Sequence, residues 1–180
     1  VRQCRYWLDF GYELEVSVNL SARDLTDEYL PYHVLQILKD NEVSPGMLTL
    51  EVTESSIMEN VSRAVLVLEC LRDVGVRISI DDFGTGHSSL GYLKRLPVDR
   101  LKIDRSFVRD ISIDEDDRTI TAAIIGMAQH FKLELIAEGV ETEQHLSMLK
   151  TLGCNEVQGD YFSRPVPANE FEKLLDADGQ

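Results

Sequence analysis

The sequence predicts an α/β fold whose parallel strands close into a barrel. Short apolar, β-branched runs recur six times in the 180 residues, and stretches of helical period lie between most of them. Parallel strands need helical crossovers and burial on both faces, which accounts for this alternation. A polar residue lies at or next to the carboxyl end of every run. Such residues converge on one rim when the sheet closes, whereas an open sheet spreads them along a crevice. Convergence favours the barrel.

The predicted strands are mainly apolar along their length, and a polar residue lies next to or at the carboxyl end of each. They occupy Leu14–Asn19, Leu48–Val52, Val76–Ile80, Arg100–Ile103, Leu133–Ala137 and Glu156–Val157. No Pro/Ser-rich linker and no change of composition interrupts this series. We therefore expect a single domain over residues 1–180.

Helical segments are expected at Val1–Phe10, Tyr29–Asp40, Asn60–Val74, Asp116–Phe131, Thr142–Leu152 and Asn169–Leu175. Pro31 suits the first turn of the second segment, because that position needs no backbone N–H donor. Gly75 and Gly153 suit the left-handed position that follows a helix. The first segment reads as a helix entered partway along, so we expect the chain to be cut at its N-terminus.

The clearest helix is the one over Asp116–Phe131. Its apolar residues recur with helical spacing and form one stripe, which is expected to pack on the sheet: Ile120, Ala123, Ile124, Met127, Ala128 and Phe131.

The charge balance limits the possible partners. Thirty-two acidic and 18 basic residues give a net charge of −14, so the general field repels phosphate backbones and anionic lipid. We expect no DNA binding and no membrane contact. The three widely spaced cysteines form no disulfide pattern, and no apolar stretch is long enough to span a bilayer, which favours a cytoplasmic location.

Polar residues at the strand ends are the candidate site. They are Asn19, Glu51, Asp81, Asp82, Lys102, Asp104, Glu138 and Gln158. A single strand-end carboxylate is usually a helix cap or a solvated loop residue. However, adjacent Asp81 and Asp82 would repel one another in a partly buried rim unless a cation lies between them. Asn19, Glu51 and Asp81 offer oxygen ligands alone, which indicates Mg²⁺ or Mn²⁺ rather than zinc.

Two further chemical roles are open at this rim. Lys102 is the lone cation, suited to holding a water or a phosphate oxygen, and the alternative is a salt bridge to Asp81 or Asp104. Glu138 or Glu141 is suited to act as a general base. We expect no histidine catalysis, since three histidines fall in predicted helices and the fourth is a loop residue after DDFGTG: His33, His130, His145 and His87.

Several blocks together resemble the EAL-domain family of cyclic di-GMP phosphodiesterases. In order they are VNLSA, LEVTES, DDFGTG followed by SSL, YLKRLPVDRLKIDRSFV, AEGVE and QGDYFSRP, and the likeness runs from about Val1 to Leu175. The resemblance implies a modified TIM-type (β/α)8 barrel. It also implies hydrolysis of one phosphodiester of cyclic di-GMP to linear pGpG with two Mg²⁺ or Mn²⁺ ions, as part of bacterial second-messenger signalling.

The resemblance also implies a role for each matching residue. Asn19, Glu51 and Asp81 would bind the first metal, and Asp81 and Asp82 the second. Lys102 would position the nucleophilic water, which Glu138 would help to activate.

The resemblance implies roles for four more positions, of which Asp104 and Glu141 match the family less directly. Gln158 would complete the site by hydrogen bonding. Glu54, the second glutamate of EVTE, would steady the DDFGTG loop, which contributes to metal binding and to a homodimer contact. Asp104 and Glu141 would lie behind the ligands or face the substrate.

One departure from the family pattern is large. The Glu-Ala-Leu segment, with another ligand glutamate and a substrate-contacting arginine, normally lies upstream of the position of Val1. About 70 residues and two strands are missing against a barrel of about 250 residues. We therefore expect the C-terminal three-quarters of the barrel, with impaired activity, and possible upstream sensory or GGDEF-type domains in the parent protein.

Two other functions are compatible with parts of the pattern. A non-catalytic cyclic di-GMP receptor would keep the fold, and the missing glutamate favours it, but a receptor does not need the whole acidic set. An enolase-like lyase also places carboxylates and lysine around Mg²⁺ at strand ends, but the order of the motifs disfavours it.

Overall fold

The computed structural model describes residues 1–86 and 90–178 and contains one parallel sheet with strand order β1-β2-β3-β4-β5-β6. The strands are β1 (Val16–Leu20), β2 (Leu48–Thr53), β3 (Arg77–Phe83), β4 (Arg100–Ile103), β5 (Glu134–Ala137) and β6 (Glu156–Val157). Each strand pairs with the next one in sequence, so every connection is a crossover. This sequential parallel order is that of a (β/α)8 barrel, and six strands are present in the described residues.

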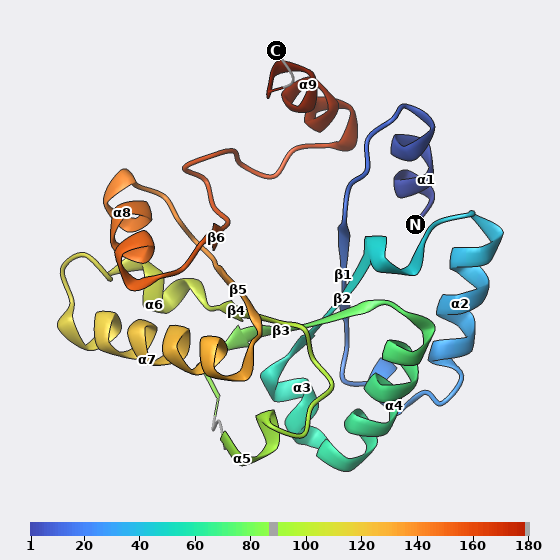
Figure 1. The fold of residues 1–180 in the computed structure, drawn as a ribbon, viewed down its shortest axis with the longest axis horizontal. Coiled ribbons are helices and arrows are strands. Elements are labelled where there is room, and N and C mark those ends of the chain that lie inside the picture. Colours follow the sequence, from blue (N-terminus) through green and yellow to red (C-terminus); the bar gives the residue numbers. More distant parts are fainter. Residues whose placement is uncertain (87–89, 179–180) are drawn as a thin grey trace.

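The helices cover one side of this sheet. Figure 1 shows the strands as an arc with the major helices outside it. They are α1 (Arg2–Asp9), α2 (Leu30–Asp40), α3 (Glu54–Glu59), α4 (Val61–Val74), α5 (Leu90–Leu93), α6 (Arg105–Arg109), α7 (Glu115–Phe131), α8 (Glu143–Leu152) and α9 (Ala168–Asp178), with short 3-10 turns η1 (Asp24–Thr26) and η2 (Pro45–Met47).

The predicted elements are confirmed in type and in order, with boundaries that agree within a few residues. Pro31 lies in the first turn of α2, and α4 and α8 end at Gly75 and Gly153, which have φ of +97° and +92°. The short helices α3, α5 and α6 were not predicted, because four to six residues are too few to show a helical period.

The predicted apolar stripe of α7 was partly wrong. The buried residues of this helix are Thr121, Ile124, Ile125 and Ala128, whereas Ile120 is 39% exposed. Ile120, Ala123 and Met127 line a shallow hollow with Phe83 and two glycines of the loop after β3, although Met127 also packs against the hydrophobic core. The face that packs on the sheet is therefore rotated relative to the prediction, because part of the apolar surface of α7 faces this loop.

Strict alternation along the strands separates the core from the interior of the arc. Leu50, Val52, Ile78, Ile80, Leu101 and Ile103 are at most 2% exposed and belong to the hydrophobic core. The residues between them, such as Glu51, Ser79 and Lys102, point to the opposite side of the sheet. That inner side is polar, although these three residues are also buried.

Ion pairs cross the inner side near the start of the strands. Arg77 and Arg100 each bind both Glu15 and Glu134, with N–O distances between 2.6 and 3.0 Å. Glu15 directly precedes β1, and Glu134 begins β5, so these pairs connect parts of the sheet that are not neighbours. We name these four residues the ion-pair layer.

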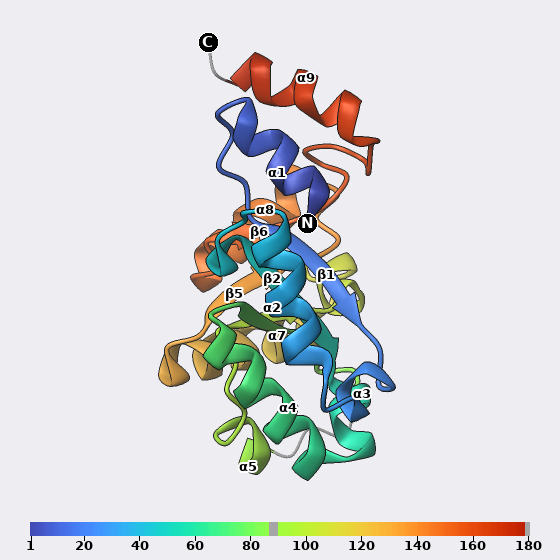
Figure 2. The ribbon, with the colours of Figure 1, turned by 90° about the vertical axis from the view of Figure 1, so that its right-hand side faces the viewer.

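The first and last helices contact one another. The Trp7 indole N–H donates to Glu172 Oε1 at 2.9 Å, and its ring lies 5.7 Å from that of Phe171. Both views show α1 and α9 side by side (Figures 1 and 2). Among the described residues, no helix has the combination of length and apolarity required to cross a membrane.

Candidate active site

The site begins with the parity of the strands. On β2, β3 and β4 the inward-facing positions near the carboxyl ends are Glu51, Asp81 and Lys102. Glu138 directly follows β5, and its backbone N–H donates to Ile103 O at 3.1 Å. Parallel strands therefore bring four charged side chains to one edge of the sheet.

Lys102 lies at the centre of these carboxylates. Its Nζ is 3.0 Å from Glu51 Oε2, 3.2 Å from Asp81 Oδ1 and 2.6 Å from Glu138 Oε1. The side chain is 5% exposed. Although burial by itself lowers the pKa of Lys102, hydrogen bonds to Glu138 and Glu51 hold it above its ordinary value. Lys102 is thus a fixed positive charge in the rim. The salt bridge to Asp81 is present, and no ion pair to Asp104 is found among the described residues.

Asp81, Asp82 and Glu138 form an acidic cluster. One carboxylate oxygen from each lies within 4.8 Å of the others. Burial, followed by repulsion from Asp81 and Asp104, raises the pKa of Asp82. Burial also raises the pKa of Glu138, against the lowering effect of Lys102. Three carboxylates thus share this edge of the sheet with Lys102, and an oxygen-rich site of this kind suits a hard divalent cation.

A backbone irregularity brings Asp82 to this cluster. By strict alternation adjacent Asp81 and Asp82 would face opposite sides of the sheet. However, Asp82 has φ of +52°, and the register of β3 against β4 shifts between Ile80 and Phe83. A left-handed aspartate in a strand is uncommon and is often found at functional sites. The irregularity places both carboxylates at the rim.

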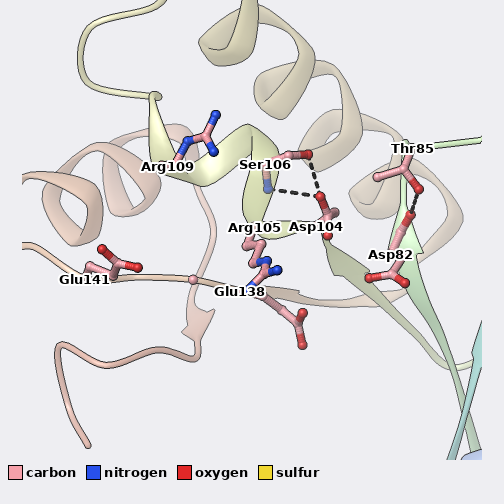
Figure 3. Close-up of a pocket in the computed structure, with 9 residues that line it drawn as sticks. Asp82, Thr85, Asp104, Arg105, Ser106, Arg109, Glu138 and Glu141 are labelled. Atoms are coloured by element: carbon pink, nitrogen blue, oxygen red, sulfur yellow. Dashed lines mark hydrogen bonds between the residues drawn. The ribbon is translucent and has the colours of Figure 1, made fainter. Parts of the chain in front are cut away.

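A pocket of about 790 Å³ opens beside the cluster. Figure 3 shows its side chains coming from the ends of β3 and β4, from α6 and from the loop after β5. The lining residues are Asp82, Thr85, Asp104, Arg105, Ser106, Arg109, Glu138, Gly139 and Glu141. The predicted residues Asp82, Asp104, Glu138 and Glu141 therefore share one pocket.

Glu54 lies beneath the loop that follows β3. This carboxylate is 1% exposed, accepts from Gly84 N at 3.2 Å and accepts from the Tyr92 hydroxyl at 2.9 Å. A Cβ on Gly86 would lie 3.1 Å from the Glu54 carboxyl, so the loop backbone packs directly on it. Glu54 thus connects α3 to both sides of the loop. His87, predicted as a loop contact, lies outside the described residues.

Asp104 is the N-cap of α6. Its Oδ1 accepts from Ser106 N at 2.9 Å and from the Ser106 hydroxyl. Although burial by itself raises it, these hydrogen bonds hold the pKa of Asp104 below its ordinary value. Asp104 fixes the direction in which α6 leaves β4.

The loops after β5 and β6 are joined by backbone hydrogen bonds. Val140 N donates to Gln158 O at 3.0 Å, and Tyr161 N donates to Val140 O at the same distance. A Cβ on Gly159 would lie 2.2 Å from Val140 O, so only glycine allows this approach. Together these contacts hold the loop that carries Glu138 and Glu141.

Asn19 and Gln158 lie at the margins of the site. Asn19 is exposed on β1 and is the register partner of Glu51. Gln158 follows β6 and is exposed, with its backbone held by Ala137 and Val140. No side-chain hydrogen bond of either residue is found among the described residues. Their roles as ligand and hydrogen-bond donor stay predictions.

Comparison with known proteins identifies the family. The EAL domain model matches residues 1–165. The chain belongs to the EAL domain family. The bifunctional diguanylate cyclase/cyclic di-GMP phosphodiesterase MucR of Pseudomonas aeruginosa is 46% identical over 171 residues, which are 94% of this chain and 25% of the relative. The chain thus spans about a quarter of the length of this curated EAL relative.

Solved EAL structures share the fold. The c-di-GMP complex of the PaMucR phosphodiesterase has a TM-score of 0.90 and 46% identity, covering 94% of this chain and 69% of that one. The manganese/cy-diGMP complex of Klebsiella pneumoniae BlrP1 at pH 6 has a TM-score of 0.84 and 30% identity, covering 91% and 42%. The predicted fold class and family are confirmed.

Sequence reasoning missed part of the EAL pocket. Thr85, Arg105, Ser106 and Arg109 line it but were not proposed as site residues. Arg105 lies two residues after Ile103, the end of the predicted strand. This closeness to a strand end was the signal that could have identified it as a site residue. Without α6 in the prediction, the direction of their side chains was not defined.

Proposed function

We propose that this EAL domain hydrolyses one phosphodiester of cyclic di-GMP and releases linear pGpG. The observation that supports this is the rim itself: Lys102 fixed among three carboxylates, beside an acidic cluster that opens into a large pocket. Two comparisons agree with this proposal. A similar protein is named as a bifunctional diguanylate cyclase/cyclic di-GMP phosphodiesterase, and structural neighbours were solved as c-di-GMP and manganese/cy-diGMP complexes.

The acidic cluster fits divalent cations. Its candidate ligands are carboxylate oxygens that lie within 4.8 Å of one another, and burial, together with repulsion from Asp81, raises the pKa of Asp82. We propose two Mg²⁺ or Mn²⁺ ions, one held by Asn19, Glu51 and Asp81 and one by Asp81 and Asp82. Such a pair lowers the pKa of water and neutralises charge that develops on the phosphate. It also explains how a chain of charge −14 binds a dianion.

The side chains of this chain then divide the work. Lys102 orients the attacking water or a phosphate oxygen through an ammonium that stays protonated. Glu138, with a raised pKa, is suited to accept a proton from that water. Gln158 is assigned hydrogen bonding to this group, and Asp104 and Glu141 support the ligands or face the substrate. Glu54 holds the loop after β3 so that Asp82 keeps its position.

The wider setting is also proposed. We place the domain in the cytoplasm as a homodimer, in a protein with possible sensory or GGDEF-type domains. That residues 1–180 form a single domain stays a prediction. That this chain is less active than one with the upstream segment also stays a prediction.

Incubation of the purified chain with Mn²⁺ and cyclic di-GMP tests the function. Chromatography should show pGpG that forms in proportion to time and enzyme, and EDTA should stop its formation. Saturable binding without any product would instead establish the receptor function. The absence of both binding and product would contradict cyclic di-GMP as the ligand.

A further inference from the structure

His145 is a buried histidine that has no part in the proposed mechanism. It lies in the first turn of α8 and is 7% exposed. Its Nδ1 accepts from the backbone N–H of Glu141 at 3.4 Å, so this nitrogen carries no proton and the ring N–H is on Nε2. The imidazole therefore serves as an acceptor for the loop that follows β5.

A second contact makes the arrangement reciprocal. The backbone N–H of His145 donates to Oγ1 of Thr142, the N-cap of α8, at 3.1 Å. In a capping box the N-cap hydroxyl accepts in the same way, while a Glu or Gln at the third helical position reaches back to the N-cap N–H. His145 occupies this third position but reaches one residue further, to Glu141. It therefore connects α8 to the loop before it, in addition to capping the helix.

This loop carries the proposed general base. At its start, the backbone N–H of Glu138 donates to Ile103 O at 3.1 Å, and at its end the backbone N–H of Glu141 donates to His145. Between them Gly139 has a left-handed backbone with φ of +72°. Figure 3 shows the carboxylates of Glu138 and Glu141 on this loop. The first bond joins two backbones, whereas the second depends on the side chain of His145.

We infer that His145 is a positioning residue for Glu138. It holds the Glu141 end of the loop, and thereby the direction of the Glu138 carboxylate, whose Oε1 lies 2.6 Å from Lys102 Nζ. This inference rests on the proposed function, in which Glu138 accepts a proton from the attacking water. Because the segment from Glu138 to Glu141 is short, a displacement of one end changes the geometry at the other. A displacement of about 1 Å at a reacting group lowers the rate about 100-fold.

A purely structural role of His145 predicts a different result. If it only capped α8, its loss would lower the stability of the fold and leave the turnover of the folded chain unchanged. Thr142 offers the matched control. Its hydroxyl accepts from the backbone of His145, so removing this hydroxyl weakens the cap and leaves the bond from Glu141 to the imidazole in place.

The test compares His145→Leu, His145→Gln and Thr142→Ala in the full chain. With Mn²⁺ and cyclic di-GMP, kcat and KM are measured well below the melting temperature of every variant. His145→Leu should lose about 10- to 100-fold, mainly in kcat, because Glu138 acts on the attacking water. His145→Gln, which has the usual acceptor of this position, should restore most of kcat. Thr142→Ala should lower the melting temperature by about 2–4 °C and keep the wild-type kcat.

Amide hydrogen exchange at Glu141, followed by NMR, gives a readout that needs no substrate. Exchange should be faster in His145→Leu than in the wild type and slow again in His145→Gln. Unchanged exchange or unchanged kcat in His145→Leu would overturn the assignment while leaving the proposed function intact. An equal loss of kcat in His145→Leu and Thr142→Ala would do the same. A wild-type chain that neither binds nor cleaves cyclic di-GMP would overturn the proposed function, and the role of His145 in catalysis with it.

Discussion

Asp81 occupies the position where most interactions of the site meet. It touches Lys102, it belongs to the acidic cluster, and its Oδ1 accepts from the backbone N–H of Asp82 at 3.1 Å. A neutral side chain of the same shape would keep the last contact and weaken the electrostatic ones. Replacing Asp81 by asparagine therefore tests the effect of its charge while its shape is kept.

We predict that Asp81→Asn lowers kcat/KM for cyclic di-GMP by about 100-fold or more, at the upper end of losses caused by altering a metal site. Titration with Mn²⁺ should show a raised metal requirement, because both proposed ions lose a charged ligand. The melting temperature serves as the control for folding. Unchanged turnover at limiting Mn²⁺ would refute the bridging role of Asp81.

Glu54 acts at a distance from the reacting atoms. We predict that Glu54→Ala lowers kcat about tenfold, because it removes acceptors from Gly84 N and Tyr92 Oη. Glu54→Gln keeps a side-chain acceptor and should therefore lose less activity than Glu54→Ala. The measurement compares kcat and kcat/KM of both variants with those of the wild type at several Mn²⁺ concentrations. If both variants retain the wild-type rate, the loop does not depend on this carboxylate.

For single residues, the sequence predicted which ones lie at the carboxyl end of a strand. Asp81, Lys102 and Glu138 were assigned to the rim because parallel strands end there, and their contacts agree with this. Asp82 was assigned to the rim as well, but the left-handed backbone that turns it inward was not predictable, because such a conformation is uncommon at a non-glycine residue.

At the scale of elements, the loops after β5 and β6 form one unit. Gly159 lets the second loop approach the backbone of Val140, and Gly139 lets the first approach Arg105. The positions of Glu138 and Glu141, the proposed site residues of these loops, therefore depend on close backbone packing.

We predict that Gly159→Ala destabilises the chain by about 3 kcal/mol, the upper end of the usual cost of overpacking, because its Cβ would lie 2.3 Å from Val140 N. Urea unfolding followed by circular dichroism measures the change. Gly126→Ala on α7 is the matched control: nothing lies within 4 Å of its Cβ, and it should stabilise the helix by about 0.5–1 kcal/mol. Equal stability of both variants would contradict the packing argument.

Long elements were predicted well because their patterns repeat. The helices α4, α7 and α8 show caps and periodicity in the sequence, whereas α3, α5 and α6 have too few residues to do so. The packing face of α7 was misassigned because an apolar residue such as Ile120 is compatible with the sheet or with the loop after β3. Periodicity predicts the helix but does not show which element packs against its apolar face.

At the scale of the whole molecule, the ion-pair layer connects both sides of the arc. Glu15 and Glu134 lie on separate parts of the sheet and share Arg77 and Arg100. Although partial burial by itself raises it, hydrogen bonds from Arg100 and Arg77 hold the pKa of Glu134 below its ordinary value. The pKa of Glu15 is lowered in the same way, with Thr49 also donating.

These lowered pKa values predict acid sensitivity. A carboxylate whose pKa falls on folding stabilises the native state above its ordinary pKa, 4.5 for glutamate here, and loses this effect as pH falls through the lowered value. Glu134→Gln should therefore reduce stability at neutral pH and flatten the decline below about pH 4.5. Urea unfolding across this range provides the measurement. Glu69→Gln, at an exposed position of α4, is the control, and an identical pH profile for Glu134→Gln and wild type would exclude the ion-pair layer as the cause.

The contact between α1 and α9 makes the molecule report optically on its own ends. Trp7 is the single tryptophan of the chain, and its indole rests against Phe171 and Glu172. Its emission spectrum should shift when the terminal helices separate, whether or not the sheet remains folded. Fluorescence and circular dichroism recorded on one sample will then distinguish fraying of the ends from unfolding of the sheet.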